Sequence, residues 1–427
     1  MRTGFRPSVG LALAALVLAC PSCSSKPAEA PGERSESSSP PSNAPTVVVG
    51  YTASASGKLN VESIRQRNGL ELWREHVNAT GAWRVETRWY DDESRSDRIQ
   101  ELYTRLATND HANFLISPYS SGLTAAAAVI SEQYGIPMIS TGAASDSTYQ
   151  QGLTMVYQVY TPASQYLTGA LDLLAARLPD LKKLAILHEA DRFSSDVAAA
   201  VKARAEASGY AVVLDEGYDS ATTDFSPFIN KIQQARPDAV VGGGHFQDGS
   251  ALARQLADKR VAVPFVALLV APPEPSFAEL GSAAIGIVGP SQWEPQAAYD
   301  AAAAQAAGTR WVGPTGAEFA HAYLQAFGEQ PSYHAAGGYA AGLVLQDALQ
   351  RAGSGEATAL KTALDATDIM TFFGRTTFAT APESHGLQVG HLMVYVQWQQ
   401  GAGGKPVKRV VWPAAAASAE LAARPTP

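Results

Sequence analysis

The chain has 427 residues, and its 40 acidic against 32 basic side chains give a net charge of −8. This mild acidity, without a basic stripe, argues against a nucleic-acid partner. Hydrophobic residues make up 46% of the chain, enough for a large folded body. The two cysteines, Cys20 and Cys23, both lie near the N-terminus, so the body of the chain holds no internal disulfide.

The first 45 residues differ from the rest. Arg2 and Arg6 precede an apolar run over residues 9–19, which is too short to span a bilayer and has the form of a secretory signal. The run ends in VLAC, which resembles the lipobox of bacterial lipoproteins. We therefore expect a signal peptide over residues 1–19, lipidation of Cys20, and a disordered tether over residues 20–45, rich in Ser and Pro. Cys23 is a weaker acceptor, and the C-x-x-C spacing lacks the folded context that redox chemistry needs.

From Thr46 to Val288, buried strands alternate with amphipathic helices. This alternation is typical of parallel sheets with helices on both faces, and the body is too long for a single core. The predicted strands are 46–52, 84–90, 113–117, 136–140, 155–159, 183–188, 210–215, 238–242, 264–268 and 284–288. The predicted helices between them are 61–78, 96–108, one beginning at Ser120 or Ser121, 164–177, 194–208, 225–235 and 248–259.

The last part of the chain changes character. Residues 295–312 read as a loop or short helix, and helices are predicted over 316–327, 335–351 and 358–366. Alternating strands at 375–378, 390–399 and 408–412 then form a hairpin-like closure. Residues 414–427 are of low complexity, and we expect a disordered tail.

Two neighbouring loops point to a binding site. The strand at 113–117 and the strand at 136–140 each end in small, hydroxyl-rich residues, Ser117–Gly122 and Ser140–Ser145. Loops at the carboxyl ends of parallel strands line the ligand crevice, and a helix N-terminus there suits a small anion. The simpler interpretation is that these serines only cap a helix and fill a turn.

The order of several segments resembles a known family. VVVGYTASASG, YDDESRSD, LISPYSSGLTAAAAVISEQYGIPMIS, TTDFSPFINKIQQARPDAVV and PSYHAAGGYAAG follow one another as in type I periplasmic solute-binding proteins of the branched-chain amino acid ABC transporter group. The resemblance covers about residues 46–412. It implies an α/β fold of two doubly wound parallel-sheet lobes, joined by three crossover segments, that close on a ligand between them.

By this resemblance the first lobe takes residues 46–162 plus 292–375, and the second takes 163–291 plus 376–413. The crossovers would fall near Thr161-Pro162, near Gly289–Trp293 and near Gly374–Thr376. Glycine and proline at these places suit segments that set a hinge angle.

The resemblance also implies the ligand-binding residues. In the first lobe, a ligand carboxylate would be held by Ser121, with Ser120 beside it, and by the loop of Gly142, Ala143 and Ala144. The family has a hydroxyl residue where this chain has Ala144, and the neighbouring Ser145 can substitute for it. From the second lobe, Phe193 and His245 would contact the ligand, although His245 can equally be a structural histidine bonded to the backbone.

The half of the site that would bind an ammonium group departs from the family. Its two acids fall at Ala163 and at about Leu269, and a buried ammonium without a partner charge is costly. A plain α-amino acid would need one of four other acids, although acids in such positions are more often solvated loop acids or helix caps: Asp91, Asp146, Glu189 and Asp248. Trp293, Tyr333 and His334 fall near the cleft by position, but core packing or hinge filling is the favoured role for them.

These features predict an extracytoplasmic, lipid-anchored solute-binding protein of an ABC importer, monomeric, with membrane permease subunits as partners. Its ligand would be a small, amino-acid-like solute bearing a carboxylate or amide. No metal site is expected, since the histidines lack ligand spacing, and no cofactor. Enzyme signatures such as G-x-S-x-G and H-E-x-x-H do not occur, so we expect no enzyme. A sensor of the same fold is the alternative, and a small-amide hydrolase a remoter third.

Overall fold

The computed structural model describes residues 44–297 and 299–425. Its first sheet has the strand order β2-β1-β3-β4-β5, with every neighbouring pair parallel. Its inner strands are buried because helices cover both faces of the sheet, whereas β2, at the edge, is partly exposed. The strands of this sheet are β1 (Thr46–Ala53), β2 (Arg84–Asp91), β3 (Phe114–Ile116), β4 (Met138–Ser140) and β5 (Val156–Gln158).

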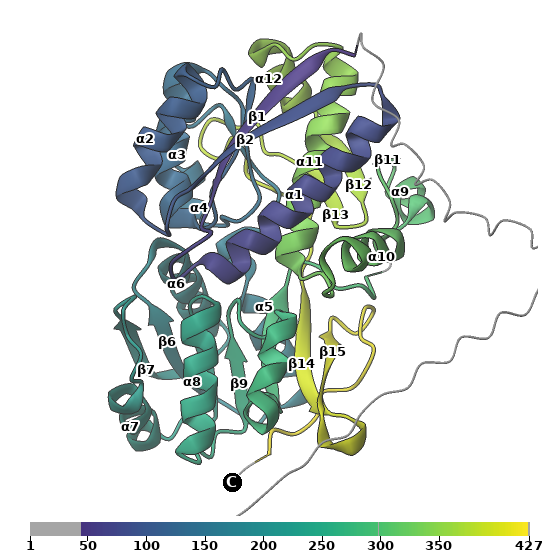
Figure 1. Cartoon of the computed structure of the whole chain (residues 1–427). Helices are drawn as coiled ribbons and strands as arrows, with labels where there is room; N and C mark the ends of the chain where they lie inside the picture. Colours follow the sequence, from purple (N-terminus) through teal and green to yellow (C-terminus); the bar gives the residue numbers. More distant parts are fainter. Residues whose placement is uncertain (1–43, 298, 426–427) are drawn as a thin grey trace, which may run out of the picture. The chain divides into compact units, whose positions relative to one another are not determined.

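Helices cover both faces of this sheet (Figure 1). α2 (Ser96–Thr108) and α3 (Ser121–Tyr134) contact each other on one face, while α1 (Asn60–Thr80) and α11 (Tyr333–Ala352) form a closely packed pair on the other. Glycine allows this approach, because a Cβ on Gly69 would lie 1.9 Å from the carbonyl oxygen of Ala335. A Cβ on Gly338 would lie 2.0 Å from the carbonyl oxygen of Gln66. The same lobe contains α4 (Asp146–Tyr149), α10 (Gly316–Phe327) and α12 (Ala357–Asp365).

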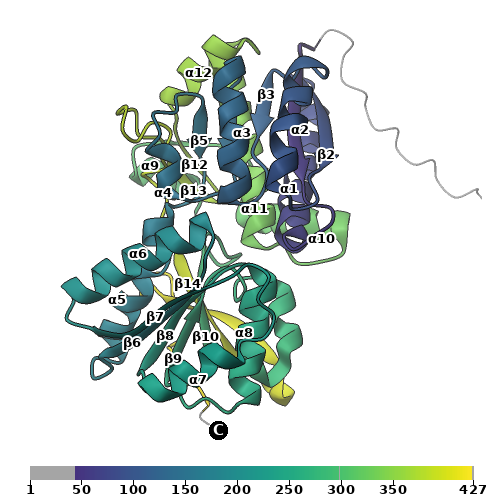
Figure 2. The same ribbon diagram turned by 90° about the vertical axis from the view of Figure 1, so that its left-hand side faces the viewer.

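A second sheet builds the other lobe, in the order β15-β14-β10-β9-β8-β6-β7. The strands from β6 to β10 are parallel, and β14 and β15 extend the sheet as an antiparallel hairpin. Figure 2 shows the helices on either side of this sheet. The strands are β6 (Lys183–Glu189), β7 (Ala211–Tyr218), β8 (Ala239–Gly243), β9 (Phe265–Leu268), β10 (Ile287–Ser291), β14 (Val394–Gln400) and β15 (Pro406–Trp412). The helices are η1 (Ala163–Gln165), α5 (Thr168–Arg177), α6 (Arg192–Ala207), α7 (Ser226–Ala235), α8 (Phe246–Asp258), η2 (Pro275–Ala284) and the short η3 (Ala402–Gly404).

The predicted fold class is therefore confirmed: two α/β lobes, each with the strand order of a doubly wound sheet. A small third sheet, in the order β11-β12-β13, accompanies the first lobe together with α9 (Ala301–Ala306). Its strands are β11 (Arg310–Trp311), β12 (Asp368–Thr371) and β13 (Gly374–Thr377).

The third crossover lies later than the sequence predicts. β13 pairs with β12, and the N–H of Gln158, on the first sheet, donates to the carbonyl oxygen of Gly386 at 2.8 Å. The chain therefore passes to the second sheet only between Gln388 and Val394, not near Gly374–Thr376. The Arg375–Phe378 strand consequently closes the third sheet, and only β14 and β15 form the final hairpin.

Side chains tie the three crossovers together. The amide oxygen of Gln292 accepts from the N–H of Thr161 at 3.0 Å, linking the first and second. The hydroxyl of Thr161 bonds Nδ1 of His391 at 2.7 Å, linking the first and third. Burial lowers the pKa of His391 to about 4, so this histidine is a neutral hinge residue at ordinary pH.

The C-terminal segment is ordered where the sequence predicts a disordered tail. Gln397 exchanges two hydrogen bonds with the backbone of Ala422, each of 2.8 Å. The guanidinium of Arg424 donates to the carbonyl oxygens of Val261 and Val263 at 3.0 and 2.9 Å. Hydrogen bonds between side chains and the backbone therefore order a segment whose low sequence complexity gives no sign of them.

Candidate functional site

A small cavity lies between the lobes, where the strands of both sheets end. Its volume is about 10 Å³, roughly the space of one water molecule, so a solute of amino-acid size requires the lobes to separate or side chains to move. Most of its wall is aromatic. The lining residues are Tyr119, Ser121, Gly142, Ala144, Tyr160, Tyr166, Phe193, His245, Val270, Tyr333 and His334.

Five of the seven predicted ligand residues line this cavity: Ser121, Gly142, Ala144, Phe193 and His245. The other two do not. Ser120 is the N-cap of α3 without a side-chain cap bond, and it lines a separate surface hollow. The carbonyl oxygen of Ala143 accepts a hydrogen bond from the hydroxyl of Ser140 at 3.1 Å.

Ser121 organises the floor of the cavity. Its Oγ accepts from the N–H groups of Ala144 at 3.2 Å and Ser145 at 3.1 Å, which fixes the loop after β4 against the start of α3. An oxygen that already accepts two hydrogen bonds retains its own hydrogen as a donor. Ser121 therefore offers one O–H donor to the cavity that it lines.

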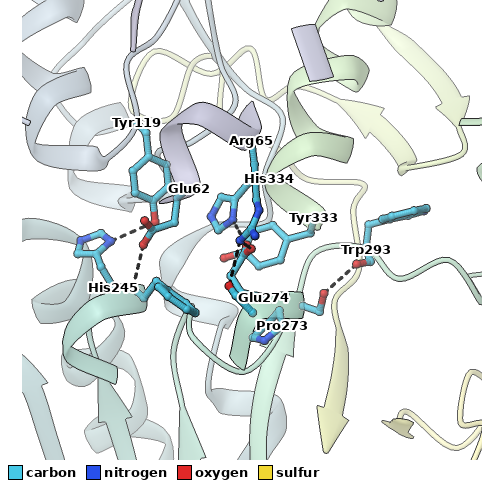
Figure 3. Close-up of polar contacts among 12 residues, drawn as sticks. Glu62, Arg65, Tyr119, His245, Pro273, Glu274, Trp293, Tyr333 and His334 are labelled. Atoms are coloured by element: carbon cyan, nitrogen blue, oxygen red, sulfur yellow. Dashed lines mark hydrogen bonds and ion pairs between the residues drawn. The ribbon is translucent and has the colours of Figure 1, made fainter. Parts of the chain in front are cut away.

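His245 joins the lobes at the opposite wall (Figure 3). It precedes α8 in the second lobe, and its Nδ1 lies 3.0 Å from the hydroxyl of Tyr119 in the first lobe. Its Nε2 lies 3.0 Å from Asp191 of the second lobe. Burial alone would lower the pKa of His245, but the hydrogen bond and charge of Asp191, with the charges of Glu189 and Glu62, raise it to about 9.

His245 is thus an imidazolium at neutral pH, and both of its N–H groups donate. Tyr119 receives one of these bonds, and burial holds the pKa of its phenol well above the usual range. The Tyr119 hydroxyl accordingly keeps a hydrogen that it can donate. Sequence reasoning missed Tyr119, which stands one residue before the serines that it singled out.

Polar side chains at the start of α1 contact the second lobe in a row. Lys58 bonds Glu189 at 2.8 Å, and a carboxylate oxygen of Glu62 accepts from the N–H of Phe246 at 2.8 Å. Arg65 is paired with Glu274. The spacing of 58, 62 and 65 is the helical i, i+4, i+7 pattern, so this polar stripe was the signal in the sequence that could have revealed the contact.

The Arg65–Glu274 pair is the most deeply buried of these contacts. Glu274, in the second lobe, also accepts from Nδ1 of His334 on α11 (Figure 3). Burial would raise the pKa of Glu274, but His334 and Arg65 outweigh it and lower that pKa. Because the ionised carboxylate only accepts, Nδ1 of His334 carries the hydrogen, and Nε2 is left buried without a protein partner.

On the opposite flank of the cavity, hydrogen bonds also join the first lobe to the second. The hydroxyl of Ser145 donates to Asp196 on α6, and the N–H of Ser147 donates to the same carboxylate at 3.2 Å. Arg192 donates to the hydroxyl of Ser147 at 3.1 Å. Hydrogen bonds on both sides of the cavity therefore hold the two lobes together.

None of the four acids considered as ammonium partners lines the cavity. Asp91 accepts from the N–H groups of Ala55 and Glu93, and Asp146 caps η1 through Ser164. Glu189 is paired with Lys58. Asp248 accepts from the N–H of His245 at 2.9 Å and from the hydroxyl of Tyr218. Asp146 and Asp248 thus have the capping role that the sequence left open, whereas the pairing of Glu189 with Lys58 was not foreseen.

The remaining candidates divide between core and cavity. Ala163 and Leu269 are buried and do not line the cavity, where Val270 stands instead. Trp293 packs on Phe319 and Phe372, as favoured from the sequence. Tyr333 and His334 do line the cavity, contrary to the core role favoured for them, because α11 begins at its edge.

The proposed lipidation site Cys20 and the signal peptide lie beyond the described residues. Within residues 44–297 and 299–425, no group of three His, Cys, Asp or Glu side chains is arranged to hold a metal ion. None of the helices in these ranges combines the length and the apolar character needed to cross a membrane.

Two lobes joined by three crossovers, with a cavity at their facing edges, define a two-lobe ligand-binding protein. Residues 46–405 match the family model described as periplasmic binding protein, and the chain belongs to that family. The resemblance to its type I members is thereby confirmed. A relative from Brucella melitensis, the Leu/Ile/Val-binding protein homolog 7, is 26% identical over 386 residues, which cover 86% of this chain and 91% of the relative.

Solved structures show the same fold at lower identity. A branched-chain amino acid transporter substrate-binding protein from Streptococcus pneumoniae, in complex with isoleucine, is 20% identical with a TM-score of 0.70 and covers 86% of this chain and 100% of that one. An ABC transporter solute-binding protein from Rhodopseudomonas palustris, in complex with 3,4-dihydroxybenzoic acid, is 21% identical with a TM-score of 0.73 and covers 84% and 95%.

Proposed function

We propose that this protein is the extracytoplasmic solute-binding lipoprotein of an ABC importer. Its solute is small, of amino-acid size, bears a carboxylate or amide, and binds between two lobes that close on it. The observation that carries this proposal is the cavity walled by both lobes and flanked by hydrogen bonds between them. Such bonds form only on closure, so closing the lobes both buries the solute and brings a composite surface together.

The similarity to transporter components supports binding without turnover. The cavity holds hydroxyl donors and an imidazolium, but in the described part of the chain the Oγ of Ser121 is bonded by two backbone N–H groups and not by a base. We expect stoichiometric binding of a solute that remains chemically unchanged. The partners are the permease subunits of the importer, which engage the closed monomer.

Native mass spectrometry of the purified protein tests the core of this proposal by weighing a co-purified solute. A mass increment matching one small molecule per chain, released intact on denaturation, is expected. Consumption of that molecule on prolonged incubation would favour an enzyme. Uptake of the same solute by cells lacking this protein should fall, and unchanged uptake would instead favour a sensor that reports to a membrane signalling partner.

Lipid anchoring at Cys20 has its own test. Cells fed a labelled fatty acid should incorporate it into the wild-type protein and into Cys23→Ala, which is the matched control. Cys20→Ala should remain unlabelled and separate from membranes on fractionation. Equal labelling of both variants would refute Cys20 as the acceptor.

A further inference from the structure

The walls of the cavity are suited to a flat ring. Tyr160 and Tyr333 stand edge to face with ring centroids 5.6 Å apart, and Tyr166 and Phe193 do so at 5.0 Å. All four line the cavity, two from each lobe or its crossover. Aromatic rings prefer offset or edge-to-face contacts with other rings, so these walls favour an aromatic solute over a branched aliphatic one.

The charges around the cavity favour an anion. No aspartate or glutamate is among the lining residues, whereas the ring of His245 is. Two of the acids nearby are paired: Asp191 with His245, and Glu274 with Arg65 and His334. Glu62, which does not line the cavity, accepts from the N–H of Phe246 with one carboxylate oxygen, while its other oxygen is buried without a partner. Burial raises the pKa of Glu62, which favours its neutral form. An ammonium group in the cavity would meet the imidazolium of His245 and would find no carboxylate in the cavity wall, which is costly in a buried site.

Three of the lining residues, Tyr119, Ser121 and His334, carry polar atoms that can bond a solute. The hydroxyls of Ser121 and Tyr119 each keep a hydrogen to donate, as derived above from their partners. Nε2 of His334, a fully buried side chain, has no hydrogen-bond partner. A buried polar atom without a partner is expensive, so a bound solute that supplies one gains affinity there. A hydroxyl can donate or accept, and it therefore pairs with His334 in either of its protonation states.

We propose that the solute is a small hydroxylated aromatic acid that carries a carboxylate and no ammonium group. The carboxylate is received by the hydroxyls of Tyr119 and Ser121, with its charge balanced by His245, and the ring hydroxyl bonds Nε2 of His334. This inference rests on the proposed binding function and names the chemical class of its ligand. Asp191 acts as a positioning residue, because it holds His245 in its charged form without touching the solute.

Calorimetric titration of the ligand-stripped full-length protein tests the class directly. The probes are 4-hydroxybenzoate, 3-hydroxybenzoate, benzoate, 4-hydroxybenzamide and L-phenylalanine. We expect one of the hydroxybenzoates to bind most tightly, and loss of either the charge or the hydroxyl to weaken binding about 10-fold or more. L-phenylalanine, which adds an ammonium group, should bind weakest.

Tighter binding of L-phenylalanine or of 4-hydroxybenzamide than of both hydroxybenzoates would overturn the inference. So would failure of all five probes to bind. The proposed function is judged separately, because a co-purified solute of another class, seen by native mass spectrometry, would refute the ligand class and leave the binding function standing.

Asp191→Asn tests the positioning role through a pH profile. Asparagine keeps the N-cap at α6, where Asp191 accepts from the N–H of Ser194 at 2.7 Å, but removes the charge. The groups facing His245 are then Glu62 from α1, Tyr119 before α3, Glu189 from β6 and Asp248 from its own helix. Without the charge of Asp191, these groups raise the pKa of His245 less than in the wild type. Affinity for hydroxybenzoate should therefore fall between about pH 6 and pH 8 in the variant and stay level in the wild type.

Ser120→Ala, beside the site but outside the cavity, is the matched control and should retain the wild-type profile. Identical profiles for Asp191→Asn and the wild type would refute the role of the imidazolium. If Asp191→Asn does not fold, the comparison of 4-hydroxybenzoate with 4-hydroxybenzamide on the wild-type protein decides the same question.

Discussion

Replacing Glu274 by glutamine should open the lobes without unfolding them. Glu274 is fully buried and receives hydrogen bonds from Arg65 and His334, both in the first lobe. Glutamine keeps the shape but loses the charge of the pair. Each charge-assisted bond is worth about 1.5–3 kcal/mol, and Arg65 keeps Glu329 as a partner, so we expect the closed form to lose about 3 kcal/mol relative to the open form. That corresponds to about a 100-fold change in the closing equilibrium.

Small-angle X-ray scattering measures this effect as an increase in the radius of gyration. The temperature of unfolding should change little, because the pair joins two lobes rather than the parts of one. Any solute that binds the closed form should lose affinity by the same factor as the closed population.

Glu329→Gln is the matched control. Glu329 bonds the same guanidinium at 3.1 Å, but its side chain is 39% exposed and it precedes α11 in the same lobe as Arg65. Exposed pairs contribute about 0–1 kcal/mol, so this variant should keep the wild-type radius. Equal radii for Glu274→Gln and Glu329→Gln would refute the idea that the buried pair holds the lobes together.

Three further predictions use the same structure. Ser121→Ala should weaken solute binding by about 1–2 kcal/mol in calorimetry, while Ser120→Ala leaves it unchanged; equal effects would place the binding donor elsewhere. Gly142→Ala should destabilise the fold by about 1–3 kcal/mol in denaturant melts, because its Cβ would lie 2.2 Å from Oε1 of Gln66, whereas Gly122→Ala meets nothing within 4 Å and should cost no stability. Finally, the folded-state pKa of His245, about 9 against an ordinary 6.5, contributes about 3 kcal/mol of stability that is complete below about pH 6.5 and lost as the pH rises through 9. Melts from pH 6 to pH 10 should show this loss, and a flat profile would contradict the protonated imidazole.

Much of the fold could be read from local patterns. The helices α2 and α10 begin and end where the periodicity places them, and β1 to β10 follow the buried runs within a few residues. The hydroxyl-rich loops after β3 and β4 led to Ser121, because the carboxyl ends of parallel strands share one edge of the sheet. The third crossover and the ordered tail could not be predicted in this way. The crossover depends on the pairing of β13 with β12, and the tail on side-chain hydrogen bonds to residues distant in the sequence.

The sequence by itself determined the two-lobe architecture and the first-lobe floor of the site, because strand and helix periods, caps and strand-end loops are local properties. Tertiary structure alone decided the electrostatics of that site. Arg65 meets Glu274 across 209 residues, and Tyr119 meets His245 across 126. A carboxylate can be solvated, cap a helix or stabilise a protonated histidine. Which of these it does depends on its partners and its burial, and both are set only when the chain folds.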